Sequence, residues 1–106
     1  MPKYLLEAAY SVEGSKGLIK DGGTKRRAAV EKAFQSVGGR LEAFYYTFGK
    51  NDLILIADFP DNAAAAAVSL TVAASGGATI HTTVLLTPAE MDSATKKKMV
   101  YRAPGK

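Results

Sequence analysis

The stretch from Arg40 to Phe59, RLEAFYYTFGKNDLILIADF, decides the fold of this chain. It contains two runs of aromatic, aliphatic and β-branched residues, separated by the short cluster Gly49-Lys50-Asn51-Asp52. Two such runs on either side of a Gly/Asn/Asp turn are typical of a β-hairpin. We expect Gly49 to take a positive φ in this turn, and the carboxylate of Asp52 to accept backbone hydrogen bonds where the second strand begins.

The residues before the hairpin predict one strand and one helix. Residues 3–11 alternate, which places Tyr4, Leu6, Ala8 and Tyr10 on one face of a strand. Residues 12–23 contain four of the ten glycines and predict a loop with a single helical turn at 16–20. Residues 25–37 then have the spacing of an amphipathic helix, with Thr24 as its N-cap and Gly38-Gly39 beyond its end.

The residues after the hairpin predict a second helix and a fourth strand. Pro60-Asp61-Asn62 introduces an alanine-rich helix that extends to Ser75 and is ended by Gly76-Gly77. Alanine buries little surface, so this helix must approach its neighbours closely to pack. Residues 78–86, ATIHTTVLL, then have the composition of a strand.

The C-terminal residues predict a short third helix and a tail. Thr87, Pro88 and Glu90 combine an N-cap threonine, a proline at the first helical position and a glutamate that completes a capping box. The helix runs toward Lys96–Lys98, whose charges suit a helix C-terminus. Residues 99–106 are expected to form an extended tail.

The resulting order, β-α-β-β-α-β with a terminal helix, predicts a single α+β domain over residues 1–106 with a ferredoxin-like fold. In this fold two helices cover one face of a four-stranded antiparallel sheet. The other face has no predicted cover, and we expect Leu5, Phe44 and Phe48 to lie there. An exposed apolar face of this kind favours association. We therefore expect a homodimer or higher homo-oligomer in which two sheets pair as a dimeric α/β barrel.

Composition excludes several classes of site and partner. The chain has no cysteine, which excludes disulfides, thiolate nucleophiles and cysteine-zinc sites. With a single histidine, a metal site would have to be built mainly from carboxylates or assembled between subunits. We predict no metal and no cofactor. No window approaches the roughly 20 apolar residues that cross a bilayer, and the N-terminus lacks a signal-peptide core, so we expect a cytoplasmic protein without a membrane partner. The net charge is +4, but the RNP1 string of RNA-binding sheets is absent, which makes nucleic acid an unlikely partner.

The residues from Gly17 to Thr24 nearly match the P-loop pattern G-x-x-x-x-G-K-[ST]. Gly23 occupies the position that requires lysine, which argues against nucleotide hydrolysis. Arg26 and Arg27 nevertheless open a predicted helix, where cations and free backbone N–H groups can hold a phosphate or carboxylate. The alternative is a solvated first turn of the helix.

His81 and Tyr46 are the candidate catalytic residues. Histidine titrates near neutrality and can act as a base, although a lone histidine is also common as a hydrogen-bonded residue in a sheet or interface. If the mixed faces of the strands coincide, one cavity is lined by Glu7, Glu42, Tyr46 and His81. Phe44 and Phe48 would then offer stacking surface to a small aromatic or keto-acid ligand, with Arg26 or Arg27 supplying charge at its mouth. No serine-histidine-acid order or paired-carboxylate motif accompanies these residues.

The hairpin Gly49-x-x-Asp52, the preceding GGTKRRAAVEKAFQSVGG and the following TTVLLTPAE resemble the GYD-domain family of small bacterial proteins. The resemblance covers nearly the whole chain, although Asn51 stands where the family's tyrosine is expected. That family is similar to the dimeric α/β-barrel superfamily. The resemblance implies a small-molecule-binding barrel, with cofactor-independent monooxygenase or isomerase activity as one form. The alternative is a non-catalytic oligomeric interaction or structural protein with a basic surface.

Overall fold

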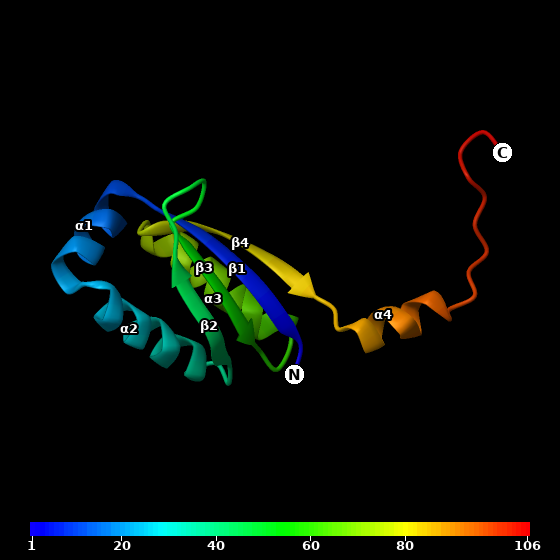
Figure 1. Ribbon diagram of the computed structural model, residues 1–106, viewed down its shortest axis with the longest axis horizontal. Coiled ribbons are helices and arrows are strands. Elements are labelled where there is room, and N and C mark those ends of the chain that lie inside the picture. Colours follow the sequence, from blue (N-terminus) through cyan, green and yellow to red (C-terminus); the bar gives the residue numbers. More distant parts are fainter.

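The computed structural model describes all 106 residues and contains one four-stranded sheet with the strand order β2-β3-β1-β4 (Figure 1). All neighbouring strands are antiparallel. The strands are β1 (Lys3–Tyr10), β2 (Arg40–Tyr46), β3 (Leu53–Asp58) and β4 (Ala78–Leu85). β2 and β3 form the expected hairpin. The order and directions confirm the ferredoxin-like α+β fold.

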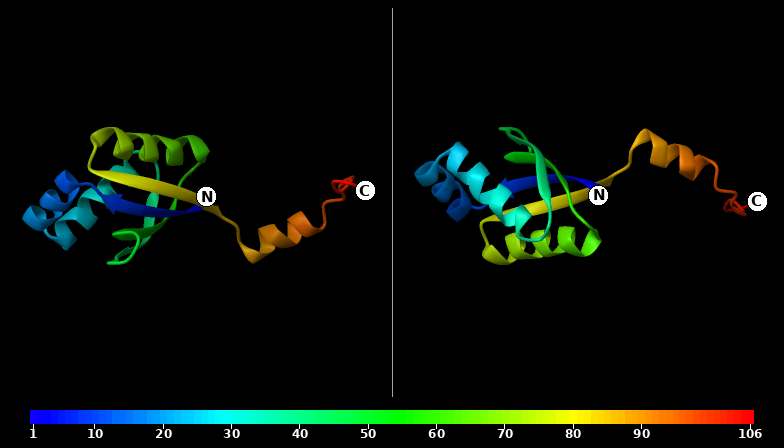
Figure 2. Two further views of the ribbon diagram at one scale, coloured as in Figure 1. Left: turned by 90° about the horizontal axis from the view of Figure 1, so that it is seen from above. Right: turned by 90° about the horizontal axis from the view of Figure 1, so that it is seen from below.

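Helices cover only one face of this sheet. They are α1 (Val12–Asp21), α2 (Gly23–Gln35), α3 (Asn62–Ser75) and α4 (Pro88–Thr95). α2 packs over β2 and α3 packs over β4. α4 extends away from the sheet together with the C-terminal tail, as Figures 1 and 2 show. The opposite face, which we call the open face, has no helix above it.

The two C-terminal helices begin and end where their caps predict. Asp61 caps α3 by accepting the backbone N–H of Ala64 at 2.9 Å, and Gly76 ends that helix with φ 74°. Thr87 and Glu90 form the predicted capping box of α4, with reciprocal hydrogen bonds of 3.1 and 3.0 Å. These local signals confirm the predicted positions of both helices.

The region between β1 and β2 differs from its prediction. Residues 12–21 form a helix where a loop was expected, because Ser11 accepts the N–H of Gly14 at 3.1 Å and caps it. Gly22 has φ 82° and separates α1 from α2, so α2 begins at Gly23 and Thr24 is not its N-cap. The glycines allow close packing of this segment: a Cβ at Gly14 would lie 1.9 Å from the carbonyl oxygen of Gly77.

A β-bulge at Glu42 changes which side chains of β2 face the helices. Leu41 pairs with Ala57, but the register shifts before Ala43, so Phe44 pairs with Leu55. One extra residue moves all later side chains to the other face. Phe44 therefore packs against the core on the helix-covered side, and the prediction that it lies on the open face was wrong.

The turn of the hairpin confirms one of its two predicted features. Asp52 accepts the backbone N–H of Tyr10 at 2.8 Å, as expected of an acid at a strand start. Gly49 does not have a positive φ, and a Cβ added there would meet nothing within 4 Å. The conformational reason predicted for Gly49 was therefore wrong.

The core lies between the sheet and helices α2 and α3. Its largest fully buried side chains are Tyr4, Leu6 and Phe59, and the Phe59 ring lies 5.1 Å from that of Phe34. The even-numbered residues of β1 face this core as predicted. No helix in the chain has the length and apolarity that crossing a membrane requires.

Candidate functional site

A cavity of about 590 Å³ lies between the helix-covered face of the sheet and helices α1, α2 and α3. Its floor comes from β1, β3 and β4, and its walls come from facing sides of α2 and α3. Most of the lining is apolar and includes Ala8, Leu53, Leu55, Ala33, Phe34, Ala67, Val68 and Val72. The volume falls within the range of small-molecule sites.

Small side chains explain why this space is not filled. On the covered face, α2 packs along the edge strand β2 and α3 packs along the edge strand β4. The middle of the sheet therefore lies between the two helices. Ala8 on the floor, Ala33 on α2 and Ala67 on α3 are too short to close the gap. Ala65 and Val68 of α3 are buried in the core, while the small side chain of Ala67 leaves room beside them.

The two charged side chains of the cavity lining lie at the end that α1 closes. Tyr10, Asp21 and Arg26 line this end. The carboxylate of Asp21 faces the ammonium group of Lys25 at 4.0 Å. Half-buried Arg26, in contrast, makes no ion pair with any carboxylate of the chain. Its guanidinium is therefore available to an anionic group in the cavity.

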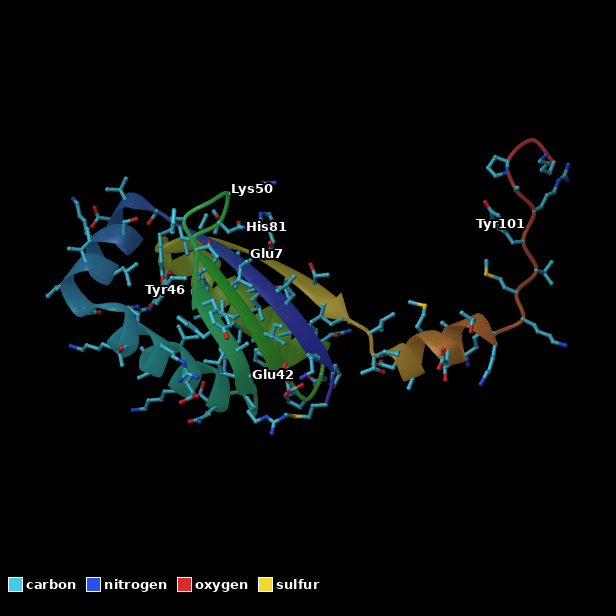
Figure 3. The ribbon with its side chains drawn as sticks, viewed as in Figure 1. Glu7, Glu42, Tyr46, Lys50, His81 and Tyr101 are labelled. Atoms are coloured by element: carbon cyan, nitrogen blue, oxygen red, sulfur yellow. The ribbon has the colours of Figure 1, made fainter.

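Tyr46 lies beside this polar end, at the junction of α1 and α2 (Figure 3). Its hydroxyl donates to the carbonyl oxygen of Gly23 at 2.9 Å. Burial raises the pKa of the phenols of both Tyr10 and Tyr46, and the positive charge of Arg26 partly opposes that shift. Both phenols are therefore protonated at neutral pH, and since the Tyr46 proton is already donated to Gly23, the Tyr10 hydroxyl is the donor left for a ligand.

Asp52 links the hairpin turn to this end of the cavity. Its carboxylate accepts the N–H of Tyr10, and its own N–H donates to the carbonyl of Ala8 at 2.8 Å. Both partners belong to β1, and both line the cavity. The turn residue that the sequence analysis singled out thus fixes the backbone that carries the Tyr10 phenol.

Glu7 and His81 lie on the open face, on the other side of the sheet from Tyr46. They are direct neighbours in the register of β1 and β4, and Figure 3 shows them close together near Lys50. Asn51 donates to the Glu7 carboxylate at 3.0 Å, while His81 remains exposed. The structure brings Glu7 and His81 together but separates them from Tyr46, so the single cavity expected for the four residues does not form.

Glu42 lies at the opposite end of the open face, where it takes part in an ionic cluster. Lys3 binds Glu42 at 3.0 Å and Asp58 at 2.9 Å, and Arg40 binds the other Asp58 oxygen at 3.1 Å. Hydrogen bonding to Lys3, supported by Arg40, lowers the pKa of the buried Asp58 carboxyl, although burial opposes this shift. The same contact with Asp58, supported by Glu42, raises the pKa of Lys3. This cluster has a structural explanation without a ligand.

The remaining candidates have different surroundings. Arg27 is exposed on α2 and pairs with Glu31 at 3.6 Å, so it does not share the position of Arg26. Phe48 is fully exposed in the hairpin turn. The Phe44 ring lies 5.2 Å from that of Tyr46 and packs beside the core. No cluster of metal-ligating side chains occurs in the chain.

Sequence reasoning did not single out Tyr10 as a site residue, and it did not predict a cavity between the helices and the sheet. The sequence feature that could have indicated the cavity is the set of small residues in β1, α2 and α3. These residues predict space between the helices and the sheet only once the topology is known. The bulge at Glu42, which sends Tyr46 toward the helices, gives no clear local signal.

Comparison with known proteins identifies one family. The model of the GYD domain family matches residues 4–95. No curated protein and no solved structure was found to match the chain.

Proposed function

We propose that this chain, which belongs to the GYD domain family, binds a small organic ligand in the cavity between α2, α3 and the sheet. The observation that carries the proposal is Arg26, a residue that lines a mostly apolar cavity of about 590 Å³ and whose guanidinium makes no ion pair within the chain. Ligand sites are typically apolar cavities with a few polar groups that fix orientation.

The lining indicates a ligand with an apolar body and one anionic or carbonyl end. Val30, Phe34, Leu55 and Val72 would contact the body, while Arg26 would bind a carboxylate by a charge-assisted hydrogen bond. The protonated phenol of Tyr10 can donate to a neighbouring oxygen. Small aromatic acids and 2-oxo acids combine these features.

Any reaction in this cavity would depend on the groups at its polar end. The reaction classes implied by the superfamily resemblance are cofactor-independent oxygenation and isomerisation. The lining side chains that could exchange a proton with a ligand are the phenol of Tyr10 and the carboxylate of Asp21. His81 lies across the sheet and has no access to this ligand from the same chain.

The proposal includes self-association through the open face. Leu5, Ile54 and Ile56 lie there half-buried, with the exposed ring of Tyr45 beside them. Covering such a surface contributes roughly 25 cal/mol per Å² of apolar area removed from water. A second copy offers the same surface, so two chains can pair isologously.

A thermal-shift screen tests the ligand class. Aromatic acids and 2-oxo acids are compared with their neutral amides, since a ligand that binds only the folded chain raises its stability in proportion to RT ln(1 + [L]/Kd). We expect acids to raise Tm more than amides, and we expect Arg26→Gln to remove this difference. Arg27→Gln is the matched control, because it removes a neighbouring charge that faces Glu31 instead of the cavity.

Two results would contradict this proposal. One is a screen without any acid that stabilises the wild-type chain. The other is an equal loss of the acid preference in both arginine variants, which would indicate a general effect of charge. Either result would favour the non-catalytic interaction protein.

A further inference from the structure

The C-terminal residues 86–106, which we call the arm, form a defined segment without a packing partner. The capping box fixes the start of α4, yet no residue of that helix is buried. Figure 1 shows the arm extending from the end of β4, away from the rest of the chain. The radius of gyration is 17.0 Å, whereas a compact domain of this length has about 13 Å.

The arm exposes five large apolar side chains among its charged residues. Met99, Val100 and Tyr101 are 78%, 103% and 69% exposed, and Leu86 and Met91 are about half exposed. A solvated tail is normally rich in polar residues and poor in aromatic and β-branched ones. A run of three large apolar residues in the tail instead indicates a segment that packs against protein.

The arm lies on the same side of the sheet as the open face. In Figure 2, α3 lies on one side of the sheet and α4 lies on the other. Each chain therefore has two uncovered apolar surfaces, one on the sheet and one on the arm, and α4 lies on the side of the sheet that the open face occupies. A second copy placed on the open face would come within reach of the arm.

We propose that the arm packs on a second copy of this chain when two open faces pair, and that the two copies exchange arms reciprocally. The inference rests on the proposed pairing of the sheets and adds the segment that completes it. We favour a second copy as the partner because each chain has one uncovered open face and one uncovered arm. In a two-fold dimer the arm of each chain can cover apolar surface on the other, and the same contacts then form twice.

Sedimentation equilibrium of full-length variants tests the contribution of the arm. The double variant Met99→Asp/Tyr101→Asp places two charges among the apolar side chains. The double variant Ser93→Asp/Thr95→Asp adds the same charge to the same arm at polar positions and is the matched control. We expect the first to raise the dimer Kd by at least about tenfold and the second by less than about threefold.

The face variant Ile56→Asp separates the arm from the pairing itself. If Ile56→Asp is monomeric, with a wild-type circular dichroism spectrum, while Met99→Asp/Tyr101→Asp dimerises like wild type, the arm proposal is wrong and the pairing stands. A wild-type chain that stays monomeric at micromolar concentration would overturn both. Loss of dimer in both variants, but not in the control, would support arm exchange.

Photocrosslinking locates the arm independently of affinity. The chain has no cysteine, so Val100→Cys can carry a benzophenone maleimide at one defined position. Mixed ¹⁴N- and ¹⁵N-labelled chains are irradiated, and crosslinked peptides are identified by mass spectrometry. Peptides of mixed isotope that join the arm to β1, β3 or β4 are expected. Crosslinks confined to single-isotope pairs would show that the arm folds onto its own chain and would overturn the proposal.

Discussion

Replacing Asp52 with alanine should lower the free energy of unfolding by about 1–3 kcal/mol, the usual contribution of a hydrogen bond to a charged group. The carboxylate of Asp52 accepts the half-buried backbone N–H of Tyr10 at 2.8 Å. The backbone bonds of Asp52 to Ala8 and Thr47, both 2.8 Å, remain possible in the variant. The loss should therefore be limited to the side-chain interaction.

Two matched variants in the same turn define the size of this effect. Asp52→Asn keeps an acceptor oxygen and loses only its charge, so we expect it to cost roughly 1 kcal/mol or less. Gly49→Val should change stability by no more than about 0.5 kcal/mol. Gly49 has no positive φ, and a Cβ there would meet nothing within 4 Å.

Urea unfolding and thermal melts measure the three variants side by side. For a domain of this size, 1 kcal/mol corresponds to a shift in Tm of about 4–8 °C. The expected order of Tm is wild type and Gly49→Val highest, Asp52→Asn next and Asp52→Ala lowest. Equal midpoints for Asp52→Ala and Gly49→Val would refute the claim that the carboxylate anchors the turn to β1.

Three further predictions follow from individual contacts. Gly14→Ala should lower the free energy of unfolding in urea by about 1–3 kcal/mol, since its Cβ would meet a backbone carbonyl at 1.9 Å. Gly17→Ala has open space around it and should raise that free energy by about 0.5–1 kcal/mol through the helix propensity of alanine. The reverse order of the two variants would contradict the packing of α1. Because the pKa of Asp58 is lower in the folded chain than in the unfolded one, its contribution to stability is present above its ordinary pKa near 4 and is lost as the pH falls through the folded value. Acid titration should therefore show a shallower loss of stability in Asp58→Asn than in wild type, and parallel curves would exclude this role. His81→Gln should leave the thermal shift given by cavity ligands unchanged, and loss of that shift would place the ligand on the open face.

The parts of the fold that were predicted from the sequence are those with local causes. The hairpin follows from two apolar runs around a turn, and the capping box of Thr87 and Glu90 identifies α4 without any tertiary contact. The alternation of β1 identifies its buried face correctly. In each case neighbouring residues alone decide the structure.

The candidate site depends on contacts that are distant in sequence, and for this reason its prediction was incomplete. The single extra residue at Glu42 turns Phe44 and Tyr46 toward the helices, and only pairing with β3 reveals it. α1 was missed because its glycines suggested a loop, whereas Gly14 provides close packing against Gly77. Arg26 was named as a candidate beside Arg27, but only the fold separates the unpaired guanidinium from the one that faces Glu31.

The central claim is that a ligand occupies the space between α2, α3 and the sheet, and filling that space tests it most directly. Ala67→Phe adds a ring to the wall of the cavity, while Ala74→Phe adds the same ring to an exposed position on the same helix. Isothermal titration with the acid that gives the largest thermal shift is then compared between the two folded variants. We expect at least about a tenfold loss of affinity in Ala67→Phe and wild-type affinity in Ala74→Phe. Equal affinity in both variants would show that the ligand binds elsewhere.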